Sequence, residues 1–128
     1  MRLARLRAGT HREAGMVTAE TAVVLPVLLL VLAAAVAAVT AVGGQLRCVD
    51  AAREGARAAA RGETVSVVTE LASRAAPDGA VVTIADEGEA VRVSVAARIP
   101  LLGSLPVGVP VEASAVGMRE PGPPGPAG

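Results

Sequence analysis

The chain has 128 residues and a formal net charge of zero, and 52% of its residues are hydrophobic although it contains no Phe, Trp or Tyr. The missing aromatic residues exclude base-stacking surfaces for nucleic acid, and the balanced charge excludes a general basic surface for DNA or RNA. All 12 Lys and Arg residues are Arg, and there is one Cys and one His. These counts exclude an intrachain disulfide framework, most zinc sites and a Schiff-base lysine.

The first clear element is an uncharged run of 26 residues from Thr21 to Leu46, built mainly of Ala, Val and Leu. As a helix it would extend roughly 39 Å at about 1.5 Å per residue, which exceeds a hydrocarbon core of about 30 Å. A buried core helix is the alternative, but the rest of a small chain cannot cover a helix that is apolar on all sides. The run therefore predicts a transmembrane helix that contacts membrane lipid.

The sequence does not decide the orientation of this helix in the membrane, or whether it is removed as a signal peptide. Four Arg residues flank it on each side, so the distribution of positive charge does not choose an orientation. Ala35-Val36-Ala37 is a possible signal-peptidase site, which makes a secreted small α+β protein an alternative. However, the apolar run continues past that site, whereas a signal peptide has an apolar region of about 7 to 15 residues.

Three residues before the apolar run form a recognisable spacing: Gly15, Met16 and Glu20. A carboxylate at the edge of hydrocarbon is costly, so Glu20 is expected to have a partner. The spacing resembles a class III prepilin signal, in which a peptidase cuts after the Gly and a carboxylate is the fifth residue of the mature chain. Cleavage between Gly15 and Met16 would make Glu20 that fifth residue. Alternatively, Glu20 interacts only with the positive end of the helix dipole.

Two further segments are similar to the TadE-like minor pilins of the Tad (Flp) type IV pilus assembly system. Residues 19–26, AETAVVLP, resemble the family's opening, and residues 50–59, DAAREGARAA, resemble its stem motif. The resemblance implies a minor pilin or pseudopilin, cut by a prepilin peptidase and used in pilus assembly or priming. Its implied partners are that peptidase, a major Flp pilin, a second TadE- or TadF-like minor pilin and the Tad inner-membrane assembly platform.

The same resemblance implies a single-pass protein of the cytoplasmic membrane. Its N-terminus would be cytoplasmic and its head extracytoplasmic, with a possible place in the pilus on the cell surface. The alternative function is a membrane anchor whose small head binds an envelope partner.

Pro26 and the stem carry the remaining structural predictions. Pro26 removes a backbone hydrogen bond inside the helix and so predicts a kink. Small residues in the stem allow close approach between helices and favour packing between neighbouring stems, whereas a solvated helix with local ion pairs is the alternative. The predicted stem-packing residues are Ala52, Arg53, Glu54, Gly55, Ala56 and Arg57. Cys48 is expected to be a small, unreactive residue outside the membrane or at its outer interface, since no second Cys can pair with it.

The rest of the chain predicts a small head with one helix and about three antiparallel strands. Helical spacing covers residues 63–76, a β-rich run covers 80–85, and alternating strands follow in 90–99 and 109–115. A head of this size without aromatic side chains should have a marginal core, which favours packing against other subunits.

These elements predict an α+β protein in five parts. The parts are a leader (1–15), a transmembrane helix (16–46), a helical stem (47–62), a head (63–118) and a disordered Pro/Gly tail (119–128). The only His, His11, lies in the predicted leader. We therefore expect no catalytic residue, no metal and no cofactor.

Overall fold

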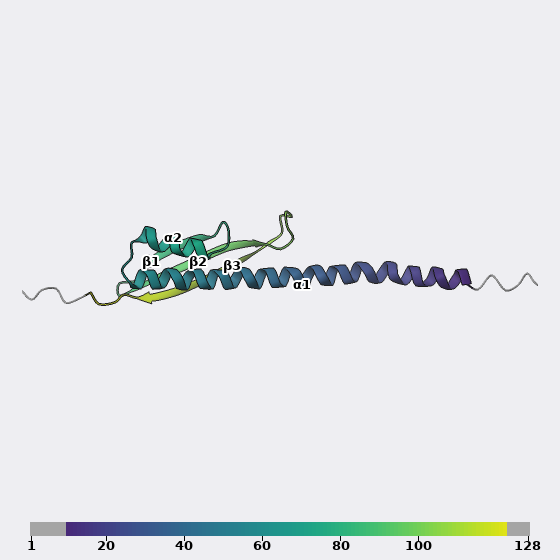
Figure 1. The fold of residues 1–128 in the computed structure, drawn as a ribbon, viewed down its shortest axis with the longest axis horizontal. Helices are drawn as coiled ribbons and strands as arrows, with labels where there is room; N and C mark the ends of the chain where they lie inside the picture. The colour runs from purple at the N-terminus through teal and green to yellow at the C-terminus, as the bar shows by residue number, and fades with distance from the viewer. Residues whose placement is uncertain (1–9, 123–128) are drawn as a thin grey trace, which may run out of the picture. The chain divides into compact units, whose positions relative to one another are not determined.

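The computed structural model describes residues 10–122, with side chains from residue 15 onward, and it separates into two compact units, 1–36 and 37–128. Helix α1 (Thr10–Ala60) contributes residues to both units. The second unit also holds α2 (Val65–Ala75) and the strands β1 (Val81–Asp86), β2 (Ala90–Pro100) and β3 (Gly108–Met118), as Figure 1 shows. The predicted α+β class, with one long helix and a small head of one helix and three antiparallel strands, is confirmed.

In the first unit, α1 is an apolar helix whose side chains are largely exposed. The segment from Gly15 onward is long and apolar enough to cross a membrane, and none of its most apolar window is buried. Pro26 lies inside α1, and the helix continues on both sides of it. The Thr21 hydroxyl donates a hydrogen bond to the carbonyl of Val17 at 2.9 Å. A kink at Pro26 stays a prediction.

The sheet is antiparallel with the order β1-β2-β3, so β2 is the central strand. Val93 pairs with Ile84 on one side and with Ala115 on the other. Side chains alternate along β2, where Val91, Val93 and Val95 are buried. This period of two is what the alternating Val residues predict, because successive side chains of a strand point to opposite faces.

Both helices pack on the same face of this sheet. Gly55 of α1 lies between Val93 of β2 and Ala72 of α2, and a Cβ added to Gly55 would be 2.9 Å from Val93 Cγ1 and 3.2 Å from Ala72 Cβ. Farther along β3, a Cβ on Gly117 would overlap the backbone carbonyl of Ala56. The second unit is therefore a two-layer structure in which α1 lies directly on the strands.

The residues of α1 that are buried against the strands are all small. They are Gly44, Cys48, Ala51, Ala52, Gly55, Ala56, Ala58 and Ala59. The strands supply the larger groups, including Val93, Val95 and Ile99. Small side chains on the helix bring its backbone close to the sheet, and the β-branched residues of the strands fill the space between them. The head, which was expected to need other subunits, thus uses α1 of its own chain as one wall of its core.

The ends of the elements are closed by specific hydrogen bonds. After α1 the N–H groups of Gly62 and Glu63 donate to the carbonyls of Ala59 and Ala58, and Gly62 has φ of 80°. This is a Schellman motif, in which the residue with positive φ is most often Gly. Thr64 caps α2, since its hydroxyl accepts a hydrogen bond from the N–H of Val67.

Two side chains of α1 tie the head to the helix. Arg47 donates a hydrogen bond to the carbonyl of Ala76, just after α2, at 2.6 Å. Gln45 donates one to the carbonyl of Glu112 in β3 at 2.8 Å. These bonds hold α2 and β3 against the same segment of α1.

Two residues that follow β3 also make contacts within the second unit. Arg119 forms an ion pair with Asp86, and the N–H of Glu120 donates to the carbonyl of Ala60. Both residues fall at the start of the predicted tail (119–128), and the extent of that tail stays a prediction. Residues 123–128 of that tail, like the leader residues Arg2, Arg5 and Arg7, lie outside the described residues.

Candidate functional site

The predicted processing residues lie in the N-terminal part of α1. Gly15, Met16 and Glu20 are helical and exposed, and a Cβ on Gly15 would meet nothing within 4 Å. Met16 and Glu20 are four residues apart, which places them on one face of the helix. Among the residues with described side chains, no ion pair involves Glu20. Its carboxylate is therefore free to pair with a group of another molecule.

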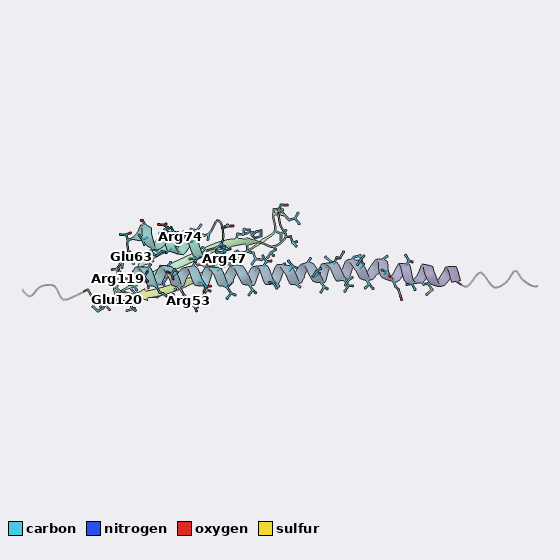
Figure 2. The ribbon with its side chains drawn as sticks, in the orientation of Figure 1. Arg47, Arg53, Glu63, Arg74, Arg119 and Glu120 are labelled. Atoms are coloured by element: carbon cyan, nitrogen blue, oxygen red, sulfur yellow. The ribbon has the colours of Figure 1, made fainter. Side chains whose placement is uncertain are left out.

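The predicted stem-packing residues divide between two faces of α1. Ala52, Gly55 and Ala56 are buried under the strands and α2 of the same chain. Arg53 and Arg57 are exposed, and Arg57 pairs with Glu54 at 3.6 Å. Figure 2 shows Arg53 among the charged side chains of the second unit. The small residues thus form the internal contact of this chain, and only the charged members are exposed to neighbouring molecules.

The exposed Arg residues border a groove beside β3. This hollow of about 250 Å³ is lined by Arg53, Ala56, Arg57, Ala60, Ala115, Val116 and Gly117. The Glu112 carbonyl accepts its hydrogen bond from Gln45, so the backbone of Glu112 faces away from β2. By alternation, Ser114 and Val116 also direct their N–H and C=O groups to this outer edge. Such an edge can pair with an extended segment of another chain, and the Arg residues favour an acidic one.

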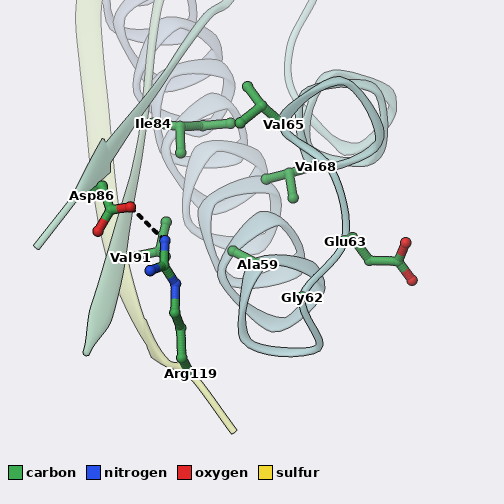
Figure 3. A pocket seen from close by; sticks show the side chains of 9 residues that line it. All are labelled: Ala59, Gly62, Glu63, Val65, Val68, Ile84, Asp86, Val91 and Arg119. Carbon is green, nitrogen blue, oxygen red and sulfur yellow. Dashed lines mark hydrogen bonds and ion pairs between the residues drawn. The ribbon is translucent and has the colours of Figure 1, made fainter. Parts of the chain in front are cut away.

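A second cavity, of about 320 Å³, lies where the end of α1 meets α2 and the sheet. Figure 3 shows its apolar side chains, including Val65, Val68 and Ile84, and the ion pair between Asp86 and Arg119 at 2.5 Å. The hydrogen bond from Arg119, followed by that from the N–H of Gly88, lowers the pKa of Asp86 below its ordinary value. Asp86 and Arg119 of this cavity are therefore already paired with each other.

The chemistry available in the described side chains is limited. No group of three His, Cys, Asp or Glu residues in the described range is placed to hold a metal ion. Cys48 is fully buried in the core, and burial raises the pKa of its thiol although Arg47 opposes the shift. Because the thiolate is the reactive form, this cysteine is a poor nucleophile in the folded protein.

Two features of the second unit were missed in the sequence. One is the contact between Gly44 and Ile99, where an added Cβ would overlap the Ile99 side chain. The sequence does contain a signal for this contact. Small residues recur every three or four positions at Gly44, Cys48, Ala52 and Gly55, which places them on one face of the helix. The other is the pair between Asp86 and Arg119, which are 33 residues apart and have no local signal.

One long apolar helix followed by a small α+β head is the arrangement of a single-pass membrane protein. Residues 15–57 match the family described as TadE-like protein. The chain is also 44% identical over 103 residues to a protein named apoptosis inhibitor Rv3655c from Mycobacterium tuberculosis, an alignment that covers 80% of this chain and 78% of that relative. No solved structure matches the chain.

This chain belongs to the TadE-like protein family, as its opening and stem motifs predicted. Membership makes it a Tad pilus-related membrane protein of a structural, pilus-associated family. The matched segment includes Gly15, Glu20 and Pro26, and it ends at Arg57 in the stem. The absence of enzymatic activity stays a prediction.

Proposed function

We propose that this protein is a minor pilin or pseudopilin of a Tad pilus, cut by a prepilin peptidase and used in pilus assembly or priming. The observation that carries the proposal is the start of the family match at Gly15, the residue before the proposed cut. Glu20 is then the fifth residue of the mature chain, and its carboxylate is exposed on α1. In this proposal the N-terminus is cytoplasmic and the head is extracytoplasmic.

Cleavage would create the partner that Glu20 needs. The new α-amine of Met16 has an ordinary pKa of about 8 and is mostly charged at neutral pH. In a filament, the amine of an adjacent subunit can approach Glu20 as the helices stagger. An unpaired carboxylate in that apolar surrounding would cost several kcal/mol, so this pairing favours correct assembly.

The groove beside β3 supports a contact with other subunits of the system. Arg53 and Arg57 give it a basic rim, and the outer edge of β3 presents the N–H and C=O groups of Ser114 and Val116. Its proposed occupants are the major Flp pilin, a second TadE- or TadF-like minor pilin or the inner-membrane assembly platform. A membrane anchor that binds an envelope partner through the same groove is the alternative function.

Intact mass and N-terminal sequencing of the membrane-extracted protein test the proposal. With a prepilin peptidase present, we expect a chain that starts at Met16 with a methylated amine, whereas Gly15→Leu should keep its leader. Gly43→Ala is the matched control, because a side chain at Gly43 meets nothing within 4 Å and lies far from the cut. An uncut wild-type chain would contradict the pilin role, and a mature start near Thr40 would establish the secreted alternative.

A further inference from the structure

The connection between β2 and β3 is unusual because its exposed side chains are apolar. Leu102, Leu105 and Val107 are 40%, 56% and 49% exposed. The N–H of Leu101 donates to the carbonyl of Val107, and that of Leu105 donates to the carbonyl of Leu102, so the turn is closed by its own backbone. No charged residue occurs from 99 to 111. Clustered exposed apolar residues of this kind mark a contact with a partner or a membrane.

Two contacts show which residues of α1 lie at the same position along the helix axis as this turn. Gly55 meets Val93 and Gly44 meets Ile99, so β2 runs antiparallel to α1 within the second unit. A strand advances about 3.3 Å per residue and a helix about 1.5 Å. Pro100, the last residue of β2, therefore lies roughly 3 Å beyond Ile99, and the turn that follows is level with α1 residues that precede Gly44. Figure 1 shows the same connection reaching past α2 toward lower-numbered residues of α1.

The α1 residues at this axial position belong to the apolar run that is predicted to cross the membrane. In the second unit this part of α1 carries Val39 and Val42, which are 74% and 60% exposed. The apolar run from Thr21 to Leu46 is about 9 Å longer than a hydrocarbon core of about 30 Å. Its C-terminal residues are consequently expected at the membrane interface, and the apolar turn reaches the same level along α1 (Figure 1).

Arg98 stands at the base of the turn. Its side chain passes over Gly108, where an added Cβ would be 3.1 Å from Arg98 Cγ. Arg98 forms no ion pair within the part of the chain whose side chains are described. It borders a hollow of about 430 Å³ together with Leu105 and Pro106. An Arg that keeps its stem on apolar groups and its guanidinium free suits the phosphate level of a bilayer.

We propose that the β2–β3 turn is a second membrane contact, which inserts Leu102 and Leu105 into the interface of the bilayer that α1 crosses. Arg98 meets the lipid phosphates at the base of the insertion. The head is then fixed at two points, which sets its height and its rotation relative to the membrane. This inference needs only that α1 spans a bilayer, and it is independent of pilus assembly and of the direction of insertion.

Site-specific fluorescence on the full chain in vesicles of phosphatidylcholine and phosphatidylglycerol tests it. The variant Leu105→Cys is labelled with a polarity-sensitive fluorophore, and Cys48 is left in place because it is buried. Met118→Cys is the matched control, since Met118 is 63% exposed and pairs with Ala90 at the opposite end of the sheet. We expect lipids with a nitroxide near the headgroup to quench the probe at position 105 several-fold more strongly than the probe at 118.

Equal quenching at the two positions would overturn the proposal. A probe at 105 that is shielded from water but not quenched by lipid would also overturn it, because a second copy or another protein would then cover the turn. Leu102→Cys repeats the measurement at a second position should the first variant fold poorly. Arg98→Gln should reduce the quenching at 105 only in vesicles that contain phosphatidylglycerol, and no change there would remove Arg98 from the contact.

Discussion

Gly55 of α1 and Val93 of β2 are in direct contact, because a methyl group at Gly55 would sit only 2.9 Å from Val93 Cγ1. Ala72 of α2 closes the site from a third side, 3.2 Å from the same position. One missing side chain therefore sets the distance at which both helices and the sheet meet.

The first prediction concerns this contact. Replacing Gly by Ala inside a helix normally stabilises it by about 1 kcal/mol. At position 55 we expect the opposite, a loss of about 1 to 3 kcal/mol in the free energy of unfolding, because the core has no room for the methyl group. Urea unfolding in detergent, followed by far-ultraviolet circular dichroism, measures the change. The control is Gly43→Ala, which meets open space; equal stability of the two variants would contradict the close packing.

The second prediction concerns Cys48, which is buried in the core formed by α1 and the sheet. We expect a maleimide to react with it only when the head opens, so its labelling rate should rise with urea along the unfolding curve. Its pKa is raised in the folded state, so above about pH 8.5 the unfolded chain loses the thiol proton first and stability falls as pH rises. Rapid labelling of the native protein would show that the core is not closed.

The third prediction is that the head lies outside the cytoplasm, as the proposed function requires. Glu63 is exposed just after α1. In Glu63→Cys we expect a membrane-impermeant maleimide to label intact cells, with the unlabelled wild-type protein as the control for Cys48. Labelling only after lysis would reverse the orientation.

The fourth prediction concerns the ion pair between Asp86 and Arg119. The folded-state pKa of Asp86 is lowered, so the pair stabilises the head above the ordinary carboxyl pKa of about 3.9 and this contribution is lost as pH falls through the folded value. Asp86→Asn should weaken the acid dependence of unfolding, measured from about pH 6 downward. Asp78→Asn is the control, because Asp78 is exposed and makes no ion pair with the described side chains. Identical acid curves for the two variants would contradict the role of the pair.

The fifth prediction concerns Glu20. We expect Glu20→Ala to keep membrane insertion and cleavage after Gly15 but to lower recovery of the mature protein with sheared pili. Arg53→Ala on the exposed stem should have a smaller effect. Wild-type recovery of Glu20→Ala would leave that carboxylate as a processing or helix-terminus residue.

The helices and strands could be predicted because each has a local signal. The uncharged run, the alternating Val residues of β2 and the turn after Ala76 are visible in the sequence and agree with the structure within a few residues. The TadE-like motifs were equally local, and the family match confirms them.

The packing of the stem could not be predicted in the same way. Small residues such as Gly55 and Ala56 favour close approach equally to another stem and to a sheet, so their pattern does not choose the partner. The pairing of Asp86 with Arg119 depends on the register of all three strands, which no short segment encodes.

The layered arrangement of α1 on the strands also determines how the head bears a mechanical load. Because β2 runs antiparallel to α1, with Gly44 against Ile99 and Gly55 against Val93, a pull along the helix axis acts parallel to the whole contact. Interdigitated side chains then resist together in shear rather than separating one after another. Tension along α1 would therefore act on β2, the central strand, and several of these contacts would have to slip together before the head separated from the helix.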